Sequence, residues 1–145
     1  TTYWPGIIRN HGLMLRLGYQ YQELDGKALY LPKHLIEKPR GYDFLYQTRQ
    51  QWAFKADYAF PILSPDLNIG SLIYIRRLRA NLFYDLSRNQ ANKQNRWMTQ
   101  SSCGGDLIID WNVLRKTYPL TTGIRLIQPI NYGKFQAEAL FSITF

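Results

Sequence analysis

The side chains that most often carry out catalysis or bind metals are few in this sequence and stand far apart. It has one cysteine, Cys103, and two histidines, His11 and His34. Neither histidine has further metal ligands near it at a fixed spacing, and Cys103 has no histidine or other base within its own segment. We therefore expect no metal ion, no cofactor and no cysteine nucleophile.

Carboxylates offer a second route to chemistry, as a paired acid and base. Asp106 and Asp110 have an even spacing that places them on one face of a strand, and Glu138 could join them. The chain has 18 basic and 10 acidic residues, a net charge of +8. In so basic a protein we expect inward carboxylates to be charge partners. The sequence therefore predicts no catalytic residue and no enzyme.

The positive charge raises the question of an anionic partner such as nucleic acid. The basic residues are dispersed, however, and their one tight cluster, Arg76, Arg77 and Arg79, sits inside an apolar segment. Nucleic acid is therefore not an expected partner. The hydrophobic content of 46% excludes a disordered tail. No uncharged run approaches the length of about 20 apolar residues that a membrane-spanning helix needs.

The elements that would position these residues are β-strands, because apolar residues recur with a period of two. Leu13, Leu15 and Leu17, for example, alternate with Met14, Arg16 and Gly18. Six segments show this alternation: 13–22, 50–60, 72–85, 106–113, 118–127 and 135–145. Arg76 interrupts the apolar phase of the third segment and leaves the start of that strand open.

The connections between these strands alternate in length. Short turns (62–68, 114–116) alternate with longer polar loops (23–44, 87–100, 129–134), and aromatic residues recur near the expected strand ends, among them Tyr58, Phe60, Tyr84, Trp111, Tyr118, Phe135 and Phe145. Both features are typical of outer-membrane β-barrels, although a soluble β-sandwich also alternates. Six strands are too few to close a bacterial barrel, whose smallest size is about eight strands. Together with a first residue, Thr1, that is not Met, this indicates a piece of a larger barrel.

Four stretches resemble the C-terminal part of the BamA-like, or surface-antigen, superfamily of outer-membrane barrels. They are Pro39-Arg40-Gly41-Tyr42, Asp57-Tyr58-Ala59-Phe60-Pro61, Phe83-Tyr84-Asp85 and the final strand from Phe135 to Phe145. Pro39 and Ser87 depart from the family pattern. The stretches 5–11, 65–70 and 74–78 look closest to TolB-like barrels of Bacteroidota, which are associated with WD-repeat domains. That resemblance implies a barrel of about sixteen strands, of which this chain would hold about the last six.

The resemblance also implies two functional sets of residues. In the superfamily the Arg-Gly-aromatic loop folds into the barrel lumen, so Arg40, Gly41 and Tyr42 would form a lumen latch with Asp85 and, as a second acceptor, Asp57. The alternative is that Arg40 is solvated and both carboxylates are ordinary polar groups. Phe141, Ile143 and Phe145 would form the C-terminal signal that the barrel-assembly machinery recognises, unless they are simply lipid-facing residues.

The sequence thus predicts an all-β, antiparallel transmembrane barrel in the bacterial outer membrane, of which residues 1–145 form the C-terminal portion. We expect a non-enzymatic role in protein assembly, translocation or anchoring. The expected partners are outer-membrane lipid, the rest of its own barrel, and other outer-membrane or periplasmic proteins. Two alternatives stay open: a barrel enzyme resembling a lipase, and a soluble β-sandwich that binds a ligand.

Overall fold

Residues 2–5, 10–21, 36–42, 48–70, 73–91, 97–113, 118–131 and 133–143 are described in a computed structural model of the chain. This part of the chain contains eight β-strands and no helix. The strands are β1 (Thr2–Pro5), β2 (Gly12–Tyr21), β3 (Thr48–Leu63), β4 (Leu67–Ile69), β5 (Ile73–Ala91), β6 (Trp97–Val113), β7 (Tyr118–Pro129) and β8 (Gln136–Ile143). The prediction of an all-β protein is confirmed.

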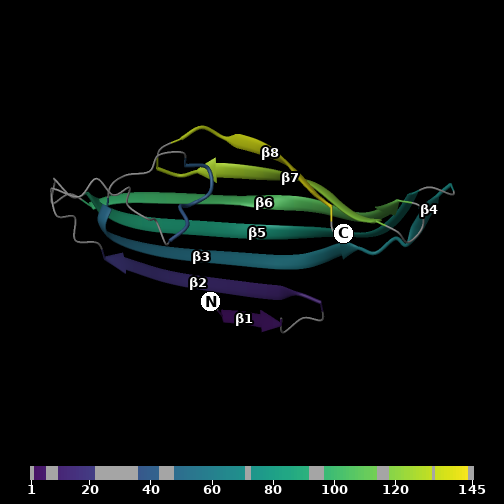
Figure 1. Ribbon diagram of the computed structural model, residues 1–145, viewed down its shortest axis with the longest axis horizontal. Coiled ribbons are helices and arrows are strands. Elements are labelled where there is room, and N and C mark those ends of the chain that lie inside the picture. The colour runs from purple at the N-terminus through teal and green to yellow at the C-terminus, as the bar shows by residue number, and fades with distance from the viewer. Residues whose placement is uncertain are drawn as a thin grey trace.

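All eight strands belong to one antiparallel sheet, in which, apart from the short β4, strands consecutive in the chain pair with each other. The order is β1-β2-β3-β5-β6-β7-β8, and the short β4 pairs with the start of β5 (Figure 1). Strands β1 and β8 lie at opposite edges (Figure 1), and the sheet formed by the described residues is open. The antiparallel meander agrees with the sequence analysis, whereas closure into a barrel belongs to the proposal below.

None of the described residues belongs to a helix long and apolar enough to cross a membrane.

All six predicted strands are present, but several of their bounds differ from the prediction. The prediction of a loop over residues 87–100 is wrong at both ends, because β5 continues to Ala91 and β6 begins at Trp97. The polar composition of this stretch has a structural reason. Ser87 accepts from Gln51 and donates to Asn89, which in turn donates to Gln100, so side-chain hydrogen bonds of 2.9–3.4 Å run across three strands.

Further differences concern short or irregular elements. Strands β1 and β4 were not predicted, because four and three residues are too few to show an alternation. The interruption at Arg76 is a β-bulge, since the pairing of β5 with β6 shifts between Ile75 and Arg77. Tyr84, expected near a strand end, lies well inside β5.

The two faces of the sheet have the reverse of the polarity found in most water-soluble proteins. On one face, which we call the polar face, the buried side chains are mainly polar or charged, among them Gln51, Lys55, Asp57, Asp85, Asn89, Ser102, Asp106 and Asp110. On the other, which we call the apolar face, large hydrophobic side chains are exposed: Leu17 by 73%, Leu82 by 53% and Phe141 by 67%. The most enclosed part of the molecule therefore lies on the polar face.

Candidate functional site

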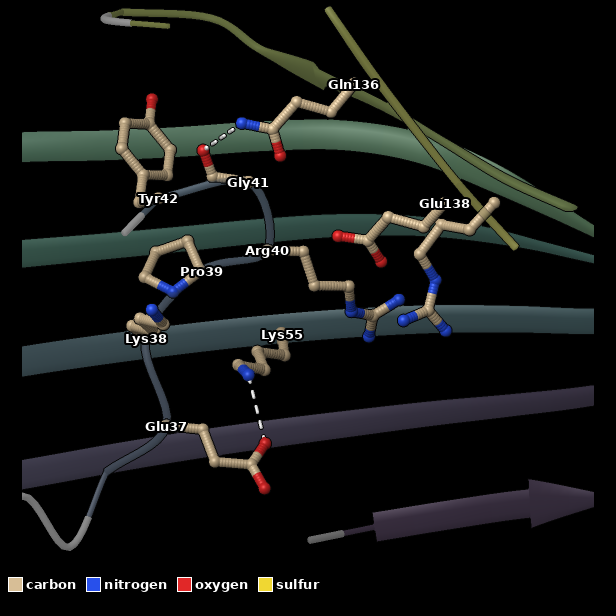
Figure 2. Close-up of a pocket in the computed structure, with 10 residues that line it drawn as sticks. Glu37, Lys38, Pro39, Arg40, Gly41, Tyr42, Lys55, Gln136 and Glu138 are labelled. Carbon is tan, nitrogen blue, oxygen red and sulfur yellow. Dashed lines mark hydrogen bonds and ion pairs between the residues drawn. The ribbon is translucent and has the colours of Figure 1, made fainter. Parts of the chain in front are cut away.

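The segment from Ile36 to Tyr42 crosses the polar face of the sheet. Figure 2 shows it passing from Glu37, in front of β2, to Tyr42, in front of β6. A pocket of about 490 Å³ lies beside it, lined by residues of the segment together with Lys55, Arg125, Gln136 and Glu138. We call residues 39–42 the PRGY segment.

Arg40 is held between two carboxylates. Its Nη2 donates to Oδ1 of Asp57 at 2.6 Å, its Nε lies 3.3 Å from Oδ2 of Asp85, and its backbone N–H donates to the same Oδ2 at 3.0 Å. The motif resemblance predicts contact with Asp85 first and with Asp57 second. Arg40 contacts both, and its shortest contact is with Asp57, so the guanidinium bridges two carboxylates instead of gripping one bidentately.

The pairing of β3 with β5 explains why both carboxylates reach one guanidinium. Asp57 stands opposite Phe83, and Lys55 stands opposite Asp85, so these four side chains form a square on the polar face with the two aspartates at one diagonal. The Arg40 guanidinium lies 4.1 Å from the centre of the Phe83 ring. A cation over an aromatic face is attracted by the ring's quadrupole, so Phe83 helps to hold the Arg40 guanidinium from the sheet side.

Gly41 is required by its backbone and by its surroundings. Its φ of +82° lies in the left-handed region, which residues other than glycine rarely adopt. A Cβ at this position would also lie 2.8 Å from Cγ2 of Ile127 and 3.2 Å from Cγ of Pro129. The Gly41 carbonyl accepts a hydrogen bond from Nε2 of Gln136 at 3.2 Å (Figure 2). This glycine therefore lets the segment approach β7 and β8 closely.

Tyr42 fixes the far end of the segment. Its side chain is buried, and its hydroxyl donates to the backbone carbonyl of Ser101 on β6 at 2.8 Å. The segment therefore contacts β3 and β5 through Arg40, β6 through Tyr42, and β7 and β8 through Gly41. No sequence pattern could have identified Ser101, because a backbone acceptor leaves no trace in residue type.

Glu37 ties the near end of the segment to the same face. Oε2 of Glu37 accepts a hydrogen bond from Nζ of Lys55 at 3.1 Å (Figure 2) and lies 3.7 Å from a guanidinium nitrogen of Arg16. The hydrogen bond from Lys55 lowers the pKa of Glu37 below its ordinary value. Glu37 and Lys55 stand in no recognisable motif, so the sequence does not predict their contact.

A second charge network continues the first across the sheet. Arg125 holds Asp106 bidentately at 2.8 and 3.0 Å, and the Asn81 amide lies between Asp106 and Asp57, donating to them at 3.3 and 3.4 Å. Asp110 accepts from Arg77, Arg79 and Thr121. Asp106 and Asp110 therefore have basic partners, Arg125 for Asp106 and the Arg77–Arg79 pair for Asp110. Glu138 stands opposite Arg125 in the β7–β8 register.

Three further candidate residues were His11, His34 and Cys103. His11 shares a hydrogen bond of 2.7 Å with the Tyr58 hydroxyl and stacks on Phe60, while His34 lies outside the described residues. Cys103 is half-buried on β6. Within the described ranges, no group of three or more His, Cys, Asp or Glu residues could hold a metal ion.

The proposed C-terminal signal is described only in part. Phe141 stands on the apolar face of β8, where it is exposed. Ile143 is the last residue of β8, and Phe145 lies outside the described residues. The side chains of the last strand are therefore described only as far as Ser142, and the signal itself stays a prediction.

Comparison with known proteins identifies no relative: no family model, no curated protein and no solved structure matches the chain. The resemblance to BamA-like barrels therefore stays a prediction from the sequence motifs.

Proposed function

We propose that this chain is part of an outer-membrane β-barrel in which the apolar face contacts lipid, the polar face lines the lumen, and the PRGY segment is latched inside. The observation that carries this proposal is the reversed polarity of the sheet. A soluble sandwich buries its apolar face against a second sheet, and no described residue forms such a sheet. A membrane barrel instead leaves that face to lipid and keeps its polar groups inside.

The apolar face carries an uncharged band, which we call the apolar band, and the positions of the charged residues along the strands set its height. On the apolar face, no charged residue of a described strand stands between Arg88 at one end and the bulge at Arg76 at the other. The stretch of β5 from Leu78 to Arg88 spans about 33 Å at ~3.3 Å per residue. A strand tilt of about 40° reduces this to a height of about 25 Å, the height of the apolar band of outer-membrane barrels.

The biological role we propose is non-enzymatic, in the assembly, translocation or anchoring of proteins at the outer membrane. Its support is the family resemblance of the sequence motifs, together with a lumen segment that contacts five strands. A segment bound this widely would limit passage through the lumen. The alternative of a lipase-like barrel enzyme requires a serine, histidine and acid set, and labelling by a serine-reactive probe would favour it.

Two matched arginine substitutions test whether the apolar face meets lipid. Leu82 and Ile69 are similarly exposed, by 53% and 56%, but Leu82 lies near the middle of the apolar band and Ile69 on β4 lies beyond it. In the complete protein folded into liposomes, Leu82→Arg should cost about 2–4 kcal/mol of unfolding free energy and Ile69→Arg about 0–1 kcal/mol.

Equal tolerance of the two substitutions would contradict the membrane assignment, because water screens a charge equally well at two exposed sites. The protein would then belong with the soluble sandwiches, and it should stay monomeric in buffer without detergent.

A further inference from the structure

The end of the apolar face nearest Arg88 carries a cluster of aromatic and basic side chains. Four exposed aromatic residues belong to it, Tyr19, Tyr21, Trp52 and Trp97, together with Arg49 and Arg88. We call these six residues the rim. The Tyr19 and Trp52 rings stand opposite each other on β2 and β3, with centroids 4.4 Å apart.

Both arginines of the rim lie against aromatic rings. Arg88 stands opposite Trp52 on β3 and Thr99 on β6, and its guanidinium lies 5.1 Å from the centre of the Trp97 ring. The Arg49 guanidinium lies 5.7 Å from the Tyr21 ring, and its Nη2 donates to the Tyr21 hydroxyl at 3.2 Å. Among the described residues, no carboxylate forms an ion pair with Arg88.

The arginines toward the other end of the sheet are arranged differently. Arg77 and Arg79 pair with Asp110 on the polar face, so a carboxylate offsets their charge. A ring holds a guanidinium in place without neutralising it. Arg88 therefore keeps its charge and its hydrogen-bond donors at the boundary of the apolar band.

We propose that the rim binds the phosphate of an anionic lipid headgroup, an inference that rests on the proposed membrane function. Tyr and Trp favour the boundary between hydrocarbon and water, where their rings meet acyl chains and their polar atoms meet headgroups. A planar guanidinium matches two phosphate oxygens at once. A phospholipid whose phosphodiester lies beside Arg88 would have its acyl chains against Leu86 and Tyr84, on the same face of β5.

Local lipid binding can be measured beside Arg88 in the complete protein folded into vesicles. A bimane label at Thr99→Cys, in a background without other cysteines, stands next to Arg88 in the register. Its quenching is compared between brominated phosphatidylglycerol and brominated phosphatidylcholine. We expect the anionic lipid to be preferred about fivefold beside the label, from the roughly 1 kcal/mol that one basic residue, Arg88, contributes near the surface, and the preference to fall as salt is added.

Arg88→Gln should reduce this preference to nearly one. The matched control, Arg16→Gln, removes the same charge from the polar face of β2 and should leave the preference unchanged. Equal loss in both variants would mean that net charge alone attracts the lipid and would overturn the proposal, as would equal quenching by the two lipids in the unmodified protein. A label that neither brominated lipid quenches would instead contradict the membrane assignment.

Discussion

Replacing Arg40 by alanine should destabilise the protein more than the loss of either other charged side chain of the segment from Ile36 to Tyr42, Glu37 or Lys38. The Asp57 and Asp85 side chains beneath it are almost fully enclosed, with exposures of 10% and 0%. Removing one partner of a buried ion pair costs about 3–5 kcal/mol, mainly because a charge is left buried without its partner. Two carboxylates are left here, and the contact with Phe83, about 0.5–2 kcal/mol, is lost as well.

We therefore expect Arg40→Ala to lower the free energy of unfolding by about 3–5 kcal/mol, within the range for buried pairs. The measurement is reversible urea unfolding of the complete protein in liposomes. The free energy of unfolding of Arg40→Lys should lie between those of Arg40→Ala and the unmodified protein, since an ammonium keeps the charge but cannot bridge both carboxylates in the same way.

Two further variants separate the latch from general effects of charge. Arg16→Ala removes an exposed arginine that lies 3.7 Å from Glu37 and should cost about 0–1 kcal/mol. Combining Arg40→Met with Asp57→Asn and Asp85→Asn should recover part of the lost stability, because no buried charge is then left without a partner. The reasoning is refuted if Arg40→Ala costs no more than Arg16→Ala.

Two other predictions concern the same segment. Gly41→Ala should cost about 2–5 kcal/mol, the sum of a left-handed backbone penalty of about 1–2 kcal/mol and about 1–3 kcal/mol for overpacking against Ile127, whereas Gly70→Ala should cost only the backbone penalty of about 1–2 kcal/mol. The two glycines have φ values of +82° and +65°, but a Cβ at Gly70 would meet nothing within 4 Å; equal costs would show that packing at Gly41 is loose. Acid should release the end of the segment near Glu37. The folded state lowers the pKa of Glu37, so the hydrogen bond from Lys55 stabilises the fold fully when the pH is above the ordinary pKa of 4.5. This stabilisation is lost as the pH falls through the lower pKa of the folded state. A spin label at Lys38→Cys should become more mobile in that acidic range, and the transition should be absent in Glu37→Gln; its persistence there would assign it to another group.

The strands could be predicted from the sequence wherever one face is apolar. The alternation of Leu13, Leu15 and Leu17 with other residues predicts β2, because successive side chains of a strand point to opposite faces of the sheet. The distal part of β5 and β6 could not be found in this way, since Ser87, Asn89 and Gln100 hydrogen-bond one another and resemble a loop in composition. The bulge at Arg76 left a visible break in the pattern, but its geometry depends on the pairing with β6.

The candidate site was accessible only through the resemblance of its motifs. Periodicity places Asp57 and Asp85 on polar positions, but the register that sets them diagonally around Phe83 follows from the pairing of β3 with β5. For the same reason the first partner of Arg40 could not be ranked in advance. Arg125 and Asn81, which extend the charge network, stand in no motif at all.

The most direct test of the central claim is a scan of lipid contact along β5. Each residue from Leu78 to Arg88 is replaced in turn by a labelled cysteine in the complete protein folded into liposomes, and quenching by brominated acyl chains is measured. Strong quenching is predicted at the apolar-face positions and weak quenching at those between them. The apolar-face positions are Leu78, Ala80, Leu82, Tyr84 and Leu86. Quenching without this period of two, or equal access of aqueous iodide to both sets, would contradict a sheet whose apolar face meets lipid.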